Sequence, residues 1–164
     1  MSTMVVRERK AARVLLLDRS DRLLLFRGFD PAEPERTWWV APGGGLDPGE
    51  DPRQAALREL REETGLTEAE VELGPVVAEN LAVFSFDGRH YEQQQWFYLA
   101  RTVRDRTHLD SSGCEPGERD QLTEARWWSV AELRGTTEQL YPQGLADLVA
   151  GLLKDGPPVL PVRL

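Results

Sequence analysis

Apolar residues in this sequence gather in short runs that are separated by polar turns. Residues 11–18 and 23–27 are rich in leucine and enclose the polar turn at residues 19–22. Two β-type runs joined by a short polar turn predict a β-hairpin. Continuous apolar runs of this kind are typical of strands that are covered on both faces of a sheet.

A second hairpin is predicted around Asp87-Gly88, a common turn dipeptide, because residues 71–86 and 91–101 flank it as strand-like runs. Further strands are expected at residues 37–41 and 125–130, helices at 131–134 and 142–153, and loops at 28–36 and 102–123. This order of elements fits a mixed sheet held between helices.

One segment has clear helix boundaries. Asp51 is a typical N-cap residue, and Pro52 suits the first helical position because its missing N–H would be unpaired there. Gln54 lies three residues after the cap, as in a capping box. Gly65 suits the left-handed position that ends a helix. These residues therefore fix the register of a helix between Asp51 and Gly65.

That register separates the side chains of the helix into two sides. At about 100° per residue, Leu57, Leu60 and Thr64 share one face, which we expect to look into a core. The other side carries the carboxylates of Glu59, Glu62 and Glu63. A solvated acidic face is the simpler interpretation, because like charges at these spacings cost a helix only roughly 0.2–0.5 kcal/mol each.

A glycine-rich loop before the helix favours a more specific interpretation. Glycine lets backbone turn through positive φ and approach a ligand closely, and the loop contains Gly43, Gly44, Gly45 and Gly49. Three carboxylates on one side of a rigid helix supply the hard oxygen ligands that suit Mg²⁺ or Mn²⁺. Loop and helix together predict a metal cluster beside a phosphate-sized gap.

Residues 44–66 resemble the Nudix box. Gly44 is followed by five residues, Glu50, seven residues and then the stretch RELREETGL, which matches the box at every defined position. The resemblance implies an α+β fold, the Nudix-type α/β/α sandwich with a mixed β-sheet between helices. It also implies Mg²⁺-dependent hydrolysis (with Mn²⁺ as an alternative) of a phosphoanhydride in a nucleoside diphosphate-linked substrate.

The resemblance assigns roles to the acidic residues. Glu59, Glu62 and Glu63 are expected to bind the metal and to be catalytic, and one of them or a nearby acid would accept the proton from the attacking water. Glu50 and Arg58 are expected to pair across the junction of loop and helix, and so to support the glycine loop.

Substrate binding is assigned to Gly43 and Gly44 of the loop and to Arg27 at the end of a predicted strand. A basic residue at that place often contacts substrate phosphates in the family, whereas the simpler interpretation is an arginine in solvent.

Trp38 and Trp39 must face opposite sides of their strand. Either both pack in the core or at its rim, or one offers a flat surface to a base or sugar. The alternate glutamines Gln93, Gln94 and Gln95 line a polar pocket or form a wet sheet face.

The chain departs from the family pattern at one position. Many members carry a further acidic residue shortly before the strand predicted at residues 125–130, and here that position is Gln121. Glu118, Asp120 and Glu124 surround it and are candidates to replace it. The number of metal ions and the identity of the general base therefore stay open.

Length and composition restrict the function further. With 164 residues, the chain predicts one domain, with extended termini at residues 1–10 and 155–164. A net charge of −8 argues against a nucleic acid polymer as partner, but a bound metal still allows a small nucleotide substrate. Cys114 is the only cysteine, which excludes an internal disulfide. No membrane partner is expected, because no apolar run is long enough to span a membrane. No signal core is evident either, so a cytoplasmic location is expected.

Alternatives remain at the level of activity. A non-catalytic nucleotide-binding sensor on the same fold is motivated by Gln121. The isomerase branch of the family, which acts on isopentenyl diphosphate, uses a catalytic cysteine, whereas Cys114 lies in a predicted loop away from the glycines. Signatures of ADP-ribose and coenzyme A hydrolases are not evident, which leaves nucleoside triphosphates and related nucleotides as the expected substrates. The apolar, proline-rich tail and many relatives suggest a homodimer.

Overall fold

The computed structural model describes residues 5–103, 109 and 122–164. The strands are β1 (Val6–Leu17), β2 (Leu23–Asp30), β3 (Glu33–Val40), β4 (Gly43–Gly45), β5 (Val71–Phe86), β6 (Arg89–Thr102), β7 (Leu122–Trp128), β8 (Leu140–Tyr141) and β9 (Val162–Arg163). The helices are α1 (Pro52–Thr64), α3 (Val130–Gly135) and α4 (Leu145–Asp155). Within this part of the chain, no helix combines the length and the apolar character that a membrane span requires.

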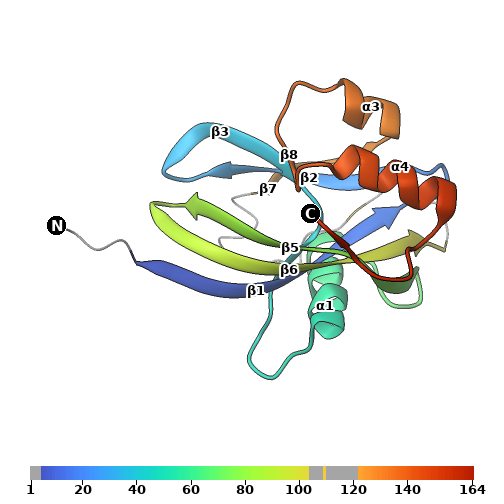
Figure 1. Ribbon diagram of the computed structural model, residues 1–164, viewed down its shortest axis with the longest axis horizontal. Helices are drawn as coiled ribbons and strands as arrows, with labels where there is room; N and C mark the ends of the chain where they lie inside the picture. The colour runs from blue at the N-terminus through green and yellow to red at the C-terminus, as the bar shows by residue number, and fades with distance from the viewer. Residues whose placement is uncertain (1–4, 104–108, 110–121) are drawn as a thin grey trace.

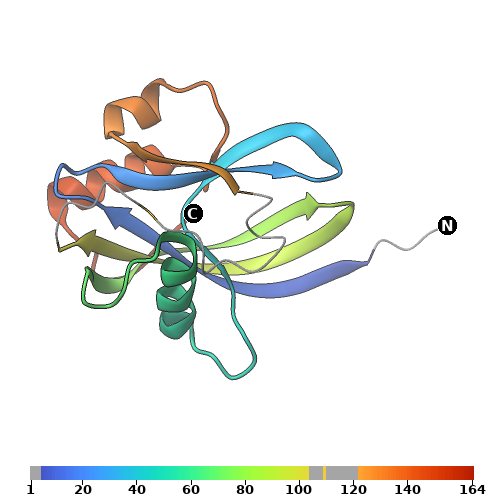
Figure 2. The same cartoon turned by 180° about the vertical axis from the view of Figure 1, so that it is seen from behind.

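The strands form one curled, mixed sheet in the order β8-β3-β2-β1-β6-β5-β9, with β4 paired to β1 and β7 paired to β2. β1 and β6 are parallel, whereas β2 pairs antiparallel with β1 at Leu17 and Leu23. From that point the β2–β3 hairpin and the long β5–β6 hairpin separate, as Figures 1 and 2 show. β4 takes the place beside β1 that β2 leaves, which brings the glycine loop onto the sheet.

Both faces of the central strands are covered, as their continuous apolar runs predict. Leu15 and Leu17 pack in a core with α3 and α4, whereas Val14 and Leu16 pack in a second core with Leu60 of α1. Alternate residues of a strand point to opposite faces, so one strand serves both cores. The predicted arrangement of a mixed sheet between helices is confirmed (Figure 1).

The predicted boundaries of α1 are confirmed. The Asp51 side chain accepts a hydrogen bond from the Gln54 backbone N–H at 2.8 Å, and the Gln54 side chain accepts one from the Asp51 N–H at 3.0 Å. This is the reciprocal capping box. Gly65 follows the last helical residue with φ of 76°, in the left-handed region.

The predicted orientation of α1 is wrong in part. Leu60 and Thr64 are buried as expected, but Leu57 is only half-buried. The buried residues of α1 are Ala55, Ala56, Glu59, Leu60, Glu63 and Thr64. The helix is therefore rotated so that two of its three carboxylates lie inside the protein. The reason is tertiary, because the glycine loop lies opposite this face: the Gly43 N–H donates to Glu63, and Gly44 leaves space for Glu59.

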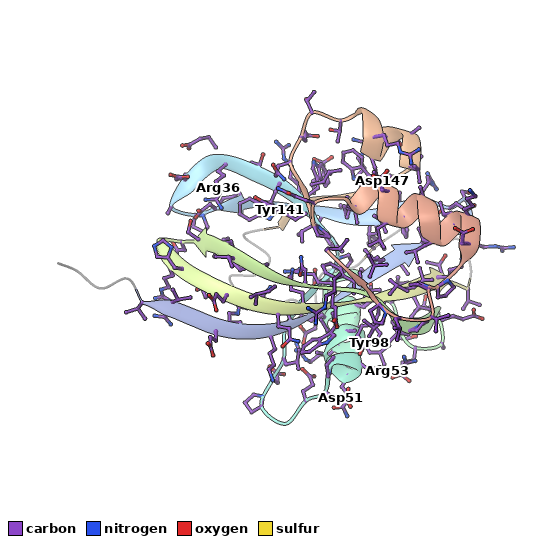
Figure 3. All side chains as sticks on the ribbon, in the orientation of Figure 1. Arg36, Asp51, Arg53, Tyr98, Tyr141 and Asp147 are labelled. Atoms are coloured by element: carbon purple, nitrogen blue, oxygen red, sulfur yellow. The ribbon has the colours of Figure 1, made fainter. Side chains whose placement is uncertain are left out.

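Residues 28–36, expected to be a loop, are instead the ends of β2 and β3. The Asp30 carboxylate is buried and accepts the backbone N–H groups of Ala32 and Asp87 at 3.0 and 2.9 Å. Arg36, labelled in Figure 3, donates to the carbonyl oxygen of Ser85 at 3.1 Å. These contacts to the β5–β6 hairpin extend polar strands that local sequence alone does not favour.

Other boundaries differ by a few residues. The strand expected at residues 125–130 ends at Trp128, where Ser129 caps α3, and the helix expected at 142–153 begins after Gly144. The tail expected to be extended contains β9, which pairs in parallel with Ala78 and Glu79 of β5. Most of the loop predicted at residues 102–123, including Cys114, lies outside the described residues.

A bulge interrupts β5 where Gly74-Pro75 breaks the apolar run, and Arg53 of α1 holds it. The Arg53 guanidinium donates to the carbonyl oxygens of Leu73 and Gly74 at 2.9 and 3.2 Å. Figure 3 labels Arg53 near the first turn of α1, beside Tyr98. The arginine thus ties the first turn of α1 to the sheet through backbone acceptors.

Replacing Arg53 with alanine is expected to lower the free energy of unfolding by about 1 kcal/mol. A hydrogen bond contributes roughly 0.5–1.5 kcal/mol, and the two that Arg53 makes are exposed to competing water. Urea denaturation followed by circular dichroism measures the change. Arg61→Ala, an exposed position on the same helix, is the control. Equal stability of the Arg53→Ala protein and the wild type would contradict the assigned contact.

Candidate active site

Gly43 brings the loop into direct contact with the sheet and with α1. Its N–H donates to Oε1 of Glu63 at 3.0 Å. A Cβ atom built at Gly43 would lie 2.2 Å from the Ala12 carbonyl oxygen and 2.7 Å from Cα of Arg13, and φ at Gly43 is +149°. Only glycine fits a backbone that approaches β1 this closely.

Gly44 packs directly against the second buried carboxylate. A Cβ atom built at Gly44 would lie 2.6 Å from Oε1 of Glu59. Glu59 and Glu63 are 4% and 5% exposed. The structure therefore brings together four of the residues singled out in the sequence, two glycines of the loop and two glutamates of α1.

Arg58 lies at the centre of a charged cluster that also contains Glu50, Glu59 and Glu62. Its Nε and Nη2 donate to the two carboxylate oxygens of Glu50, both at 2.9 Å, and Nη2 also donates to the Gly45 carbonyl oxygen at 2.9 Å. Such a bidentate pair is strong and directional. The pairing lowers the pKa of Glu50 and raises that of Arg58. Glu50 and Arg58 thus join the glycine loop to the helix.

Glu59 and Glu62 converge on one atom of the same guanidinium. Nη1 of Arg58 donates to Oε1 of Glu59 at 3.0 Å and to Oε2 of Glu62 at 3.3 Å. Glu62 is more exposed than Glu59, with 20% of its side chain accessible. Glu59 and Glu62 therefore already bind one cation together, the guanidinium of Arg58.

The surroundings of Glu63 disfavour the ionised form of its carboxylate. Burial raises its pKa well above the ordinary value of 4.5, and the neighbouring Glu59 raises it further. The charge of Arg13 and the N–H of Gly43 act in the opposite direction. Two adjacent buried carboxylates favour either a proton or a cation between them.

The residues of this site fit a divalent metal ion by their chemistry. Glu59, Glu62 and Glu63 are hard oxygen donors on one helix, which Mg²⁺ and Mn²⁺ prefer. In the described part of the chain, however, no three acidic, histidine or cysteine side chains are already arranged as a metal cluster. The Arg58 guanidinium lies between Glu59 and Glu62, donating to both through Nη1. For these two carboxylates to bind one metal ion, Nη1 of Arg58 has to move out of that position.

A hollow of about 890 Å³ opens beside the charged cluster. It is lined by Glu8, Arg9, Lys10, Gly45, Leu46, Asp47, Glu50, Arg58, Glu59, Glu62, Leu81, Glu92 and Gln94. Its volume lies in the range typical of small-molecule sites, roughly 300–1,000 Å³. The acidic helix, the glycine loop and the outer halves of β1 and β6 thus surround a space that suits a nucleotide.

Arg27 does not line this hollow. Its guanidinium lies 4.0 Å from Glu124 and 3.9 Å from Glu138, between β7 and the segment before β8. Of the candidates for the further acid, Glu124 is thus close to Arg27, whereas Glu118, Asp120 and Gln121 lie outside the described residues. Contact of Arg27 with substrate stays a prediction.

The structure decides part of the alternatives left open for the aromatic and amide residues, whereas stacking of Trp38 on a base or sugar stays a prediction. Trp39 is buried in the core and Trp38 is half-buried, 6.2 Å from the ring of Tyr141, which Figure 3 labels. Gln93 and Gln95 are buried and hydrogen-bonded to each other at 2.8 Å, so these two do not form a wet face. Gln94 is exposed and lines the hollow.

The basic residues of β1 were missed by the sequence reasoning. Arg9 and Lys10 line the hollow, and Arg13 contacts the glycine loop. For Arg13 a signal existed, because a single arginine interrupts an otherwise apolar run.

Comparison with known proteins identifies the family. The NUDIX domain model matches residues 7–150. The chain is 31% identical over 139 residues to an RNA pyrophosphohydrolase of Erythrobacter litoralis, covering 78% of this chain and 80% of that protein. A second RNA pyrophosphohydrolase, from Sphingopyxis alaskensis, is 28% identical over 93% of this chain and 94% of its own length.

Solved structures show the same fold. A MutT protein from Methanosarcina mazei Go1 has a TM-score of 0.61 at 18% identity, covering 93% of this chain and 97% of that one. An Ap4A hydrolase of C. elegans has a TM-score of 0.58 at 19% identity, with 89% and 96% covered.

The chain belongs to the Nudix family. The predicted fold class and the predicted enzyme class, a hydrolase acting on phosphoanhydrides, are both confirmed.

Proposed function

We propose that this protein is a Mg²⁺-dependent pyrophosphohydrolase that cleaves a phosphoanhydride bond in a nucleotide bound beside α1. One observation carries the proposal most directly: Glu63 and Glu59 are buried against Gly43 and Gly44, and Glu59 also lines the nucleotide-sized hollow together with Glu62. Burying two ionised carboxylates together is unfavourable unless a cation joins them.

Each residue has a defined task in this proposal. Glu59, Glu62 and Glu63 hold the metal, which supplies charge neutralisation and lowers the pKa of water when it is bound. Arg58 and Glu50 keep the glycine loop against the helix. Gly43 and Gly44 let the loop pack closely against β1 and the buried carboxylates, and contact of these two glycines with substrate phosphates stays a prediction.

The proposed substrate class rests on the sequence signatures that are absent and on the similarity of this chain to named relatives. The sequence favours nucleoside triphosphates and related nucleotides. Several relatives are named RNA pyrophosphohydrolase, which weighs against the expectation that no nucleic acid polymer is a partner. A 5′-triphosphorylated RNA therefore belongs among the substrates to be tested. The homodimer and the cytoplasmic location stay predictions.

The test is a panel of nucleoside triphosphates, a dinucleoside tetraphosphate and a 5′-triphosphorylated RNA. Phosphate and pyrophosphate release is measured for the triphosphates and the RNA, and the nucleotide products are separated by chromatography for the dinucleoside tetraphosphate. We expect turnover that saturates with Mg²⁺ concentration, stops with EDTA and returns when Mg²⁺ or Mn²⁺ is added in excess. Turnover that is insensitive to EDTA would contradict the metal. Tight nucleotide binding without turnover at any metal would contradict hydrolysis and favour the nucleotide-binding sensor.

A further inference from the structure

Arg13 is the single polar residue in the apolar run of residues 11–17 of β1, and it reaches the backbone of the glycine loop. Its Nη1 donates to the carbonyl oxygens of Ala41 and Gly43 at 3.1 and 3.3 Å. These carbonyls stand on either side of Pro42, whose own carbonyl accepts the Val14 N–H at 2.8 Å. The loop is thus attached to β1 at three consecutive carbonyls.

A buried chain of amides holds the arginine in turn. Nε of Arg13 donates to Oε1 of Gln95 at 3.1 Å, and the same oxygen accepts from Nε2 of Gln93 at 2.8 Å. Nε2 of Gln95 donates to Oδ1 of Asn80 at 3.0 Å, which links β5, β6 and β1. Gln93 and Gln95 are 3% and 8% exposed, so water competes little for these bonds.

Arg13 also faces the buried carboxylates. Burial lowers the pKa of Arg13 below its ordinary value, the charges of Glu63 and Glu59 act in the opposite direction, and the nearby cation Arg9 lowers it further. The Gly43 peptide is held from both sides, because its N–H donates to Glu63 and its carbonyl accepts from Arg13.

We propose that Arg13 is a positioning residue for the hydrolysis proposed above, on which this inference rests. Its guanidinium fixes the Ala41–Gly43 backbone, and that backbone fixes the carboxylate of Glu63 through the Gly43 N–H. Gln95 is the residue that sets the orientation of Arg13. A planar fork with several donors can serve two carbonyls and an amide oxygen together, whereas the ammonium group of lysine cannot reproduce this geometry.

The test compares Arg13→Lys, which keeps the charge, with Arg13→Gln, which removes it. We expect Arg13→Lys to lower kcat by about 10–100-fold, the usual effect of losing a partner that orients a metal ligand, with KM little changed. Mn²⁺ affinity, measured without substrate from the electron paramagnetic resonance signal of free Mn²⁺, is expected to fall about tenfold or more in Arg13→Gln.

Arg53→Lys is the matched control, because Arg53 of α1 also donates to two backbone carbonyls, but these belong to the bulge of β5 and not to the glycine loop. This variant is expected to keep the wild-type kcat and Mn²⁺ affinity. If Arg13→Lys does not fold, Gln95→Met provides the test. It leaves Arg13 in place without its amide acceptor, and we expect a loss in kcat of about tenfold.

Wild-type kcat and Mn²⁺ affinity in a folded Arg13→Lys protein, or in the Gln95→Met protein, would overturn the inference. Failure of the proposed function looks different. In that case the wild type itself turns over no nucleotide, whereas a role of Arg13 in positioning is still measured by the difference in Mn²⁺ affinity between wild type and variants.

Discussion

Replacing Glu63 with glutamine is expected to lower kcat by a factor on the order of 10²–10⁴, the range for losing a group that handles metal-bound water or its proton. The amide keeps an oxygen that accepts the Gly43 N–H, so the loop has no reason to move. What is lost is the charge beside Glu59. Steady-state kinetics with the best substrate of the panel measures the effect.

The same substitution is expected to raise the unfolding temperature in metal-free buffer. Burial and Glu59 raise the pKa of Glu63 above its ordinary value of 4.5. A raised pKa in the folded state means that the stability present below pH 4.5 is lost as the pH rises through the folded-state pKa. Glu63→Gln removes that loss. Each kcal/mol recovered shifts the unfolding temperature by roughly 2–4 °C in a chain of this size.

Scanning calorimetry with EDTA, at mildly acidic and mildly alkaline pH, checks this expectation. The gain of Glu63→Gln over the wild type should be larger at the alkaline pH. Glu72→Gln, an exposed position on β5, serves as the control and should change neither kcat nor this pH dependence. A Glu63→Gln protein with wild-type kcat would end the assignment of Glu63 to catalysis.

Gly43→Ala is expected to lower the free energy of unfolding by roughly 2–6 kcal/mol. The added Cβ would lie 2.2 Å from the Ala12 carbonyl oxygen, and backbone atoms cannot yield as a flexible side chain does. Overpacking and backbone strain each cost roughly 1–3 kcal/mol. Both costs apply here, because the clash with Ala12 is overpacking and the φ of +149° strains the backbone of an alanine.

Gly49→Ala separates the two contributions. Gly49 also has positive φ, at +77°, but nothing lies within 4 Å of its added Cβ. The control therefore carries strain without a clash, and its loss should be about 1–2 kcal/mol. Urea denaturation of both variants measures the difference. A Gly43→Ala protein as stable as Gly49→Ala would show that the loop does not approach β1 as closely as the structure places it.

Local sequence was sufficient where the interactions themselves are local. Asp51, Gln54 and Gly65 fix the ends of α1 through contacts within a few residues, and the structure has the cap and the stop as predicted. Asp87-Gly88 likewise turns the β5–β6 hairpin with positive φ at both residues. Such signals depend on backbone geometry that neighbouring residues decide by themselves.

The orientation of α1 was not predictable in this way. Periodicity favoured the leucine face as the buried one, because an isolated carboxylate avoids burial. Glu59 and Glu63 are buried nevertheless, since Gly44 leaves space for one and the Gly43 N–H binds the other. The Gly43 N–H donor and the space at Gly44 come from another segment of the chain, and no pattern within the helix reveals them.

The sequence by itself determined the family, the boundaries of the acidic helix and the residue types of its site, because these follow from short-range order and from a long motif. The tertiary structure alone decided which carboxylates are buried, that Arg27 stands apart from the hollow, and that Arg13 supports the glycine loop from β1. Those outcomes depend on contacts between residues far apart in sequence, such as Arg13 and Gln95, whose pairing arises only when the parallel strands β1 and β6 come together.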